Sequence, residues 1–536
     1  MIHLAIAERA AAAGWFEFNP GEITSATTSP AWTALTAALL SLGGFPLALP
    51  VLALVPVAAL AGTAALISRA ARRLGASAST ALLGGLLFAS LPGVAFNAPL
   101  GMENVVFAGA ALAFLLAITI PDKIRSSGVA AALGALLGLC VLLRPEGVVL
   151  AVAVAVVARD AAGEGARLGP SVLALTAVAV VGPVAYAHWR ITGCWLPGSG
   201  LSRLMAARRD VASFHVGGPV WLYLATPARL LVQLPMAWLA FEGARPPRPA
   251  PTTRRALLGT LAAGGALYTL VTGAAHVARV TGWLWALLAV FAAVGISRQL
   301  ALAAAGARGR SRGLAIACVA HVAIACAETV IRARTAAQFG GGMSRVALQR
   351  AIDRRRVGTD RMLRGLCEGG CCRDGAVPFV AMVEVQRRLS LDERVSVASL
   401  DGVTSPTRGR APAVSFDAAT GCPRMDGLLA DQRVLGVLEN PASQLARCAT
   451  SPLARALSEA WDNPSVPSPS GWRWSVALHG WMRRCDPIDQ PASSTASSIS
   501  SASRTVARRT AASLTAPSAS SNERDTPSSA TFAFHE

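Results

Sequence analysis

Arginine and carboxylate side chains interrupt an apolar stretch that runs from about position 129 to 157. They are Arg144 and Glu146, with Pro145 and Gly147 beside them. A charged side chain at the centre of a bilayer costs roughly 2.5–3.5 kcal/mol. We therefore predict two short spans that meet at a turn facing water, because Pro145 lacks an amide donor and Gly147 has no β-carbon. Such a turn could handle an anionic substrate carried on a lipid.

Glu103 is a second candidate carboxylate, directly before the apolar run 105–120. We expect it in the first turn of a helix, where the helix dipole stabilises an acidic side chain by roughly 0.3–1 kcal/mol. It either belongs to a site or serves only to stabilise the helix end. Arg144 and Glu146 have a comparable alternative, a structural ion pair that fixes the turn.

Basic side chains lie in two further segments between apolar runs. Arg190 and Arg203 belong to a segment rich in arginine and tryptophan, and His276 and Arg279 to a later one. Arginine binds phosphate through two nitrogens, and aromatic faces stack on sugars. The alternatives are an interfacial belt of aromatic and basic residues for the first segment and a structural histidine for the second.

The first thirty residues are more polar than a simple lead-in to a membrane helix requires. Residues 19–21 (Asn-Pro-Gly) predict a turn, and Ser29 followed by Pro30 predicts a helix start. Glu8 and Glu22 are the carboxylates of interest here. A site or a lid would explain this polarity, and a solvated lead-in to the first span is the alternative.

The composition is that of an integral membrane protein. Of the 536 residues, 53% are hydrophobic and 15% are charged, unlike a soluble domain. Apolar windows of about 20 residues, each long enough to cross about 30 Å of hydrocarbon, recur through the first 330 positions. They predict a mainly α polytopic transmembrane bundle of about ten or eleven spans. The candidate spans are Trp32–Leu49, Val51–Ser68, Ser79–Phe96, Val105–Ile120, the pair around Arg144, Val172–Trp189, Val220–Phe241, Leu257–Val271, Trp283–Ile296 and Leu314–Ile331.

The net charge of +19 is unevenly distributed. By the positive-inside rule the basic clusters face the cytoplasm, so the loops with Glu103 and Arg144 face outside. Before Arg69 this alternation fails: two spans in 32–68 would put the N-terminus in the cytoplasm, and one span with an interfacial helix would put it outside. We exclude nucleic acid as a partner, because the arginines lie where topology requires them. The basic clusters are 69–73, 123–125, 159–167, 245–255 and 298–312.

Three regions follow from these patterns. Residues 1–332 form the transmembrane domain, and 333–487 a small extracytoplasmic α/β domain with β-type runs at 379–385, 394–400 and 428–438. Residues 488–536, rich in Ser, Ala and Thr, are expected to be disordered. Six cysteines after 332 are compatible with disulfides in an exported region, and a zinc site among Cys367, Cys371 and Cys372 is a weaker alternative.

Taken in order, these segments resemble the motifs of GT-C-type membrane glycosyltransferases, in particular the arabinofuranosyl- and mannosyltransferase-like proteins of bacteria. Residues 2–32 resemble their first outer loop, Gly101-Met102-Glu103 their "GLE" element, and residues 143–147 their "RPEG" turn. The remaining matches are 192–197 to a "TG…LP" loop, 276–279 to an "RY" loop, and 394–406 to a strand and loop of the outer domain.

The resemblance implies transfer of a sugar from a polyprenyl-phosphate donor to a cell-envelope glycan acceptor, at the outer face of the plasma membrane. A carboxylate would act as base or metal ligand, which leaves a divalent cation open, while basic residues stabilise the departing phosphate. No residue is assigned as a metal ligand. The catalytic candidates are Glu103, Glu146, Glu8 and Glu22, and the substrate-binding candidates are Arg144, Arg190, Arg203, His276 and Arg279.

The sequence departs from the family pattern at its start. The family's acidic pair and first helix would lie before Met1, so either translation starts further upstream or this is a truncated or inactive copy. Two other functions stay open. A transporter or flippase of lipid-linked sugars predicts paired broken helices in two halves, and only the element around Arg144 is of this kind. A non-catalytic scaffold would bind an envelope partner through its outer domain.

Overall fold

The structure is a computed structural model of the 536-residue chain. It describes residues 2–14, 16–19, 22–24, 27–95, 98–120, 126–160, 168–192, 234–245, 251–271, 282–306, 308–338, 345–367, 379–382, 391–392, 394–399, 434–438, 471–475 and 480–483. By their contacts, Met1–Asp486 form one compact unit. The predicted disordered tail lies outside the described residues, and the predicted domain boundaries stay predictions.

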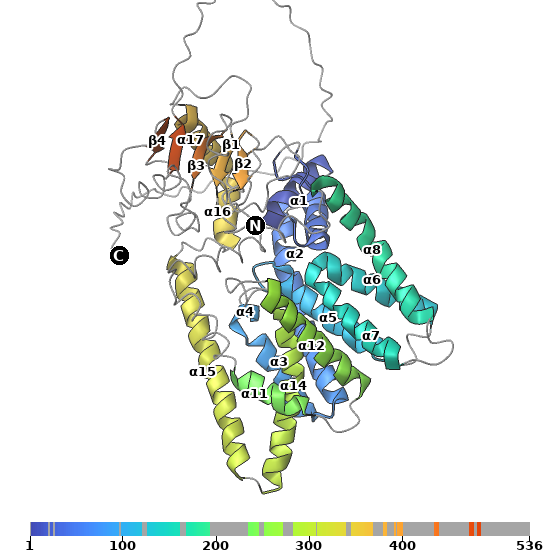
Figure 1. Cartoon of the computed structure of the whole chain (residues 1–536). Coiled ribbons are helices and arrows are strands. Elements are labelled where there is room, and N and C mark those ends of the chain that lie inside the picture. Colours follow the sequence, from blue (N-terminus) through green and yellow to red (C-terminus); the bar gives the residue numbers. More distant parts are fainter. Residues whose placement is uncertain are drawn as a thin grey trace, which may run out of the picture. The chain divides into compact units, whose positions relative to one another are not determined.

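The N-terminal part is a bundle of apolar helices, in which α2, α3, α5 and α14 pack against one another (Figure 1). This confirms the predicted mainly α helical bundle. The helices are α1 (Ile2–Ala13), α2 (Pro30–Arg73), α3 (Ala78–Ala89), α4 (Pro92–Ala95), α5 (Glu103–Ile118), α6 (Ser127–Leu143), the 3-10 helix η2 (Pro145–Leu150), α7 (Ala151–Asp160), α8 (Leu168–Thr192), α11 (Leu234–Ala244), α12 (Thr252–Val271), α14 (Gly282–Ala304) and α15 (Arg308–Gln338).

Several of these helices are built for a membrane. Within the described ranges, three are long and apolar enough to cross one: Pro30–Arg73, Gly169–Arg190 and Gly282–Ala304. Shorter apolar helices are Ala78–Ala89, Glu103–Ile118, Ser127–Leu143 and Arg312–Ala327. Large apolar side chains such as Leu42, Leu175 and Ile316 are exposed on the helix surfaces. The chain is therefore a membrane protein, whereas the count of ten or eleven spans stays a prediction.

Helix α2 is kinked in the segment whose number of spans the sequence left open. Gly43 and Gly44 leave the helical conformation, and Gly44 has φ +60°, which glycine adopts readily. The segment before this kink is about 20 Å long, too short for about 30 Å of hydrocarbon, while the segment after it is about 44 Å. These lengths favour one span preceded by a short helix over two spans.

Contacts between α2 and α5 define two ends of the bundle. A β-carbon placed on Gly101 would lie 3.0 Å from the Leu52 carbonyl oxygen, and Arg73 Nη1 donates to the Leu116 carbonyl at 2.8 Å. The second part of α2 therefore runs parallel to α5. We call the end near Arg73 and Leu116 the basic end, because α2 finishes there with Arg72 and Arg73.

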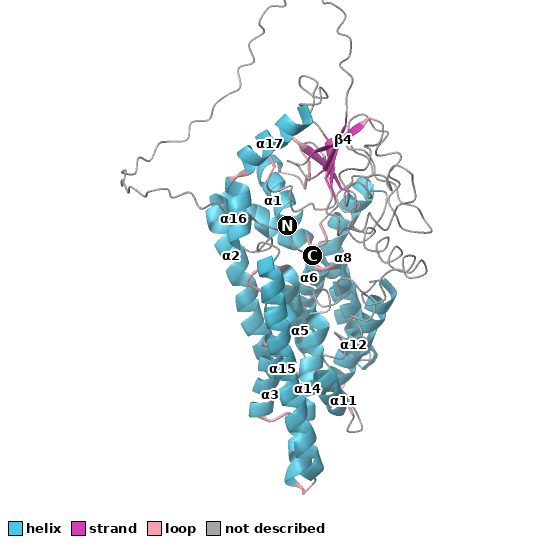
Figure 2. Ribbon diagram, turned by 90° about the vertical axis from the view of Figure 1, so that its left-hand side faces the viewer, coloured by secondary structure: helices cyan, strands magenta, loops and turns pink. Residues whose placement is uncertain are grey.

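The C-terminal part of the first unit is a small α/β region (Figure 2). Helices α16 (Arg345–Asp353) and α17 (Arg355–Cys367) precede a five-stranded sheet of order β2-β1-β3-β5-β4. Strand β1 pairs in parallel with β2 and β3, whereas β5 pairs antiparallel with β3 and β4. The strands are β1 (Phe379–Met382), β2 (Ser396–Ser399), β3 (Val434–Leu438), β4 (Trp472–Ser475) and β5 (Gly480–Arg483).

Strands β1, β2 and β3 fall within the three predicted β-type runs. Strands β4 and β5, which pair antiparallel, were not predicted. The run Ser79–Phe96, predicted as one span, divides into α3 and α4, since Pro92 cannot continue a helix.

Candidate functional site

The backbone around Arg144 forms a sharp break between two helical segments. Helix α6 ends at Leu143, Arg144 is extended (φ −157°, ψ 130°), and Gly147 N–H donates to the Arg144 carbonyl at 2.8 Å. Pro145 starts η2, where its missing N–H costs nothing. A β-carbon on Gly147 would lie 2.7 Å from the Cys140 carbonyl carbon, so only glycine fits without a shift. The predicted break between two helical segments is therefore present.

The break places Arg144 among three side chains, which together we call the Arg144 cluster (Glu103, Asn104, Arg144 and Glu146). Arg144 Nη1 donates to Glu103 Oε1 at 3.1 Å and also to Asn104 Oδ1. Arg144 Nη2 donates to Glu146 Oε1 at 2.9 Å. Glu103 reaches the arginine because α5 begins with it, as the sequence predicted. The candidates Glu103, Arg144 and Glu146 are thus brought together from three elements.

The expectation that this turn faces water is wrong. Arg144 is 3% exposed, Glu103 1% and Glu146 8%. Solvent is not the partner of these charges, because α5 supplies a carboxylate and an amide instead. With both carboxylates ionised, the cluster carries one net negative charge in an apolar bundle, so its geometry matters strongly for stability.

The start of α2 is tied to the same turn. Ser29 Oγ donates to the Leu143 carbonyl at 2.6 Å, one residue before Arg144. The hydroxyls of Thr27 and Thr33 are 2.7 Å apart, and His3 Nδ1 lies 2.9 Å and 3.2 Å from them. These buried polar contacts hold α1 and α2 against the end of α6. Sequence reasoning read Ser29 only as a helix start and did not predict this network.

Asn19 connects the N-terminal segment to the α/β region. Its Nδ2 donates to the Val397 carbonyl at 2.9 Å, and its Oδ1 accepts from Val397 N–H at 2.9 Å. Val397 belongs to β2, which lies at the edge of the sheet, so the amide side chain pairs with the edge as a neighbouring peptide group would. Asn19 Nδ2 also donates to Glu22 Oε2 at 2.9 Å. Glu22, a predicted catalytic residue, thus supports this pairing.

Replacing Asn19 by alanine is expected to release the edge of the sheet. Two hydrogen bonds of about 1 kcal/mol each are lost, which predicts roughly 30-fold faster hydrogen exchange of the Val397 amide. Peptide-resolved exchange on the purified chain measures this. The amide of Val380 in β1 serves as the internal control. Unchanged exchange at Val397 would contradict the pairing.

The other predicted catalytic residue of this segment, Glu8, also binds the C-terminal part. Arg355, at the start of α17, donates to both Glu8 carboxylate oxygens, with Nη2 to Oε2 at 2.6 Å. Glu8 and Glu22 therefore make contacts that join the N-terminal segment to the α/β region. They do not lie in the Arg144 cluster.

The remaining predicted substrate-binding residues are not part of the described cluster. Arg190 is exposed near the end of α8. Arg203, His276 and Arg279 lie outside the residues that the structure describes.

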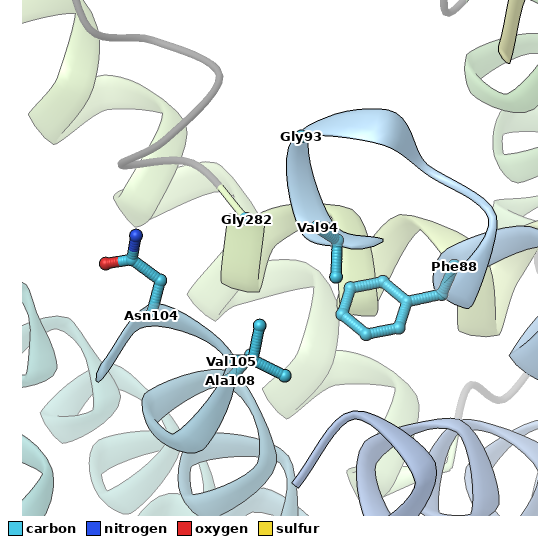
Figure 3. A pocket seen from close by; sticks show the side chains of 7 residues that line it. All are labelled: Phe88, Gly93, Val94, Asn104, Val105, Ala108 and Gly282. Carbon is cyan, nitrogen blue, oxygen red and sulfur yellow. The ribbon is translucent and has the colours of Figure 1, made fainter. Parts of the chain in front are cut away.

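Asn104 was not predicted and links the cluster to a small pocket (Figure 3). The pocket is small and partly open to solvent. Asn104 lies at one end of it, and Phe88 and Val94 lie at the other (Figure 3). Asn104 Nδ2 is buried and has no hydrogen-bond partner among the described residues, while Oδ1 binds Arg144. In the sequence, only the position of Asn104 directly after Glu103 indicated that it could belong to the site. The lining residues are Phe88, Gly93, Val94, Asn104, Val105, Ala108 and Gly282.

A divalent cation fits poorly between the two cluster carboxylates. The guanidinium of Arg144 already bridges Glu103 and Glu146, and its charge would oppose a second cation there. In the described part of the chain, no three His, Cys, Asp or Glu side chains are grouped to hold a metal. We therefore derive no step through a metal.

An exposed ion-pair network joins α17 to the start of β2. Arg394 binds Asp360 at 2.9 Å and Asp392 at 2.7 Å. Partial burial would raise the pKa of Asp392, but hydrogen bonds from Arg394 and its charge outweigh this, and the pKa lies below its usual value. Because a lowered pKa stabilises the fold only while the carboxylate is ionised, this contribution is present above about pH 3.9 and is lost as the pH falls through the lowered pKa.

The apolar helices and the buried ion cluster together define an integral membrane protein with a polar centre at one end of its bundle. No family model and no curated protein matches the sequence. The chain is similar to the solved structures of ArnT from Cupriavidus metallidurans, one bound to undecaprenyl phosphate and one in the apo state. The first has 16% identity and a TM-score of 0.46, over 84% of this chain and 89% of ArnT. The second has 16% identity and a TM-score of 0.43, over 75% and 81%. At these values the similarity carries no inference about activity.

Proposed function

We propose that the chain is an integral membrane glycosyltransferase, which transfers a sugar from a polyprenyl-phosphate donor to a cell-envelope acceptor. The observation that carries this proposal is the Arg144 cluster, with two carboxylates and an arginine buried together at one end of apolar helices. Its residues belong to two of the motifs that resemble GT-C-type enzymes. A positioned carboxylate beside the bilayer suits a reaction that takes a proton from a sugar hydroxyl.

In this proposal Glu146 is the base, because it is the more exposed of the two carboxylates, at 8% against 1% for Glu103. The acceptor oxygen forms a bond to the anomeric carbon, and the bond from that carbon to the phosphate oxygen breaks. The acceptor proton passes to Glu146, and the polyprenyl phosphate leaves with the bonding electron pair. Arg144 holds the Glu146 carboxylate in place through its Nη2. Glu103 positions Arg144 from the opposite side.

This proposal gives Arg144 a positioning role, where the sequence had indicated substrate binding. Two carboxylates and the Asn104 oxygen already contact its guanidinium. Phosphate would have to compete with those contacts. We also propose that the basic end faces the cytoplasm, following the positive-inside rule, and that the Arg144 cluster and the α/β region face outside.

A second candidate function is a non-catalytic membrane scaffold. The observation that favours it is that Glu8 and Glu22, two of the predicted catalytic carboxylates, bind Arg355 and Asn19 within the protein. A scaffold would need the N-terminal segment only for assembly. The experiment below separates the two functions.

The test is complementation of a deletion strain, with the sugar composition of the envelope as the readout. We expect the deletion to deplete one sugar and the wild-type chain to restore it. Glu146→Gln should lower transfer by about 100-fold or more, the usual contribution of a general base. Asp353→Asn, at an exposed carboxylate on α16, is the matched control and should restore the sugar fully.

Immunoblots of the membrane fraction must show equal amounts of the variants. If no envelope sugar changes on deletion, the glycosyltransferase proposal fails. If the sugar changes but Glu146→Gln restores it fully, the chain acts without this base and the scaffold function is supported.

A further inference from the structure

A second buried polar cluster lies at the basic end, on helices α11, α12 and α14. Glu242 is its centre and is 6% exposed. Its Oε2 accepts from Gln299 Nε2 at 3.0 Å, and its Oε1 pairs with Arg245 at 3.2 Å. Arg298 Nη1 donates to the Glu242 main-chain carbonyl at 3.3 Å. We call Glu242, Arg245, Arg254, Arg298 and Gln299 the Glu242 cluster.

Part of this cluster serves the end of α11. Arg254 Nη2 donates to the Gly243 carbonyl at 2.8 Å, and Arg298 binds the carbonyl of Glu242. Both carbonyls belong to the last turn of α11, where main-chain acceptors have no partner within the helix. Cations near such an end also interact favourably with the helix dipole. This role accounts for the contacts of Arg254 and Arg298, but the cluster still holds three arginines and one carboxylate, of which only Arg245 pairs with the carboxylate in the contacts described.

The exposed side of α11 marks the depth of this cluster in the membrane. Trp238, Phe241 and Arg245 lie on one helix face and are 39%, 59% and 50% exposed. The Arg245 guanidinium lies 5.0 Å from the centre of the Phe241 ring. Exposed aromatic rings beside a basic side chain are typical of the boundary between hydrocarbon and headgroups. The surplus positive charge therefore lies at headgroup depth.

A contact between α14 and the loop that follows α2 supports this depth. Ser297 Oγ accepts from Ser77 N–H at 3.3 Å, which places Arg298 at the level of the loop that follows Arg73. Arg298 itself is exposed. The Glu242 cluster thus belongs to the basic end of the bundle and is separate from the Arg144 cluster.

We propose that Arg245 and Arg298 bind the phosphate of an anionic phospholipid in the adjoining leaflet. Both side chains contact Glu242, Arg245 at its carboxylate and Arg298 at its main-chain carbonyl, and each of these contacts engages one nitrogen of the guanidinium. Arginine carries five N–H donors in a planar fork that matches phosphate oxygens. A lipid with net negative charge is favoured over phosphatidylcholine, whose own cation balances its phosphate. This inference does not depend on the proposed glycosyltransferase activity.

The rest of the cluster keeps the site rigid. The buried Gln299 and Glu242 fix the relation between α11 and α14, and Arg254 closes the end of α11. The two exposed arginines therefore present their donors from a fixed framework, which lowers the entropy lost on binding.

The test uses the full purified chain in nanodiscs of phosphatidylcholine with increasing fractions of phosphatidylglycerol, with native mass spectrometry of bound lipid. We expect wild type to bind phosphatidylglycerol in preference to phosphatidylcholine. The variant Arg245→Gln/Arg298→Gln should bind it about 25-fold more weakly, at about fivefold per arginine. Arg361→Gln/Arg364→Gln, which removes the same charge from the exposed face of α17, should bind like wild type.

Three outcomes would overturn the proposal. Wild type could show no preference for phosphatidylglycerol, a readout that needs no variant to fold. The cluster variant could bind as tightly as wild type. The control variant could lose as much affinity, which would mean that net charge alone attracts the lipid. Inorganic phosphate at the same concentration is a further arm: if it displaces phosphatidylglycerol from wild type completely, the site binds anions without lipid selectivity, which would also overturn the proposal.

Discussion

Arg144→Met is expected to lower the free energy of unfolding by about 3–5 kcal/mol, because it leaves Glu103 and Glu146 buried without their shared cation. The two carboxylates flank one guanidinium at 3.1 Å and 2.9 Å. Without it they repel each other in an apolar surrounding, where their interaction is much stronger than in water. The loss of stability is measured by titrating the detergent-solubilised chain with a denaturing detergent and following its unfolding.

A second variant tests whether the loss comes from unpaired charge. Glu103→Met, Arg144→Met and Glu146→Met combined should recover most of the stability, since replacing a whole buried ion cluster with apolar side chains is often close to neutral. Arg255→Gln is the matched control for an ion pair. Arg255 is 49% exposed and binds Asp160, so its loss should cost less than about 1 kcal/mol. An Arg144→Met effect as small as that of Arg255→Gln would contradict the cluster.

Gly243→Ala is expected to disrupt the packing of α11 against α14. A β-carbon at this position would lie 1.9 Å from the Phe291 carbonyl oxygen and 2.8 Å from the Gly295 nitrogen. Both are main-chain atoms, so the helices must move apart rather than a side chain rotate. Overpacking of this kind typically costs 1–3 kcal/mol and occasionally more, and we expect about 3 kcal/mol here. The same titration with denaturing detergent measures this change in the free energy of unfolding.

Gly182→Ala in α8 is the control for this substitution. Nothing lies within 4 Å of its added β-carbon, and alanine is the better helix former by up to about 1 kcal/mol. Its stability should be equal to wild type or slightly higher. Equal losses for both variants would show that the close contact of α11 and α14 does not limit stability. Gly295→Ala should resemble Gly243→Ala, since its β-carbon would lie 2.0 Å from the Leu239 carbonyl oxygen.

Much of the helical architecture could be predicted from the sequence, because apolar runs and their breaks are local. The break at Arg144 follows from Pro145 and Gly147, and the start of α5 at Glu103 follows from the apolar run after it. Both features depend on neighbouring residues alone. The kink of α2 at Gly43 was harder to predict from the sequence, since the same apolar composition fits one long span or two short ones.

The contacts within the site could not be predicted in the same way. Glu103 and Arg144 were each singled out, but their pairing depends on how α5 packs against α6 across 41 positions. For that reason the turn was expected to face water, although Glu103 and Asn104 enclose it. Asn104 had no distinguishing signal beyond its neighbour. The roles of the predicted site residues stay proposals.

The pairing of Asn19 with Val397 sets an order for assembly during synthesis. The two residues are 378 positions apart. At about 5–20 residues per second, the N-terminal segment is made roughly 20–75 s before its partner strand. During that interval the membrane helices insert while Asn19 has no strand to bind, and Arg355, the partner of Glu8, is made shortly before Val397. The contact between Asn19 and β2 is therefore a late step, and a ribosome that stops before Val397 leaves a chain in which Asn19 has no strand to pair with.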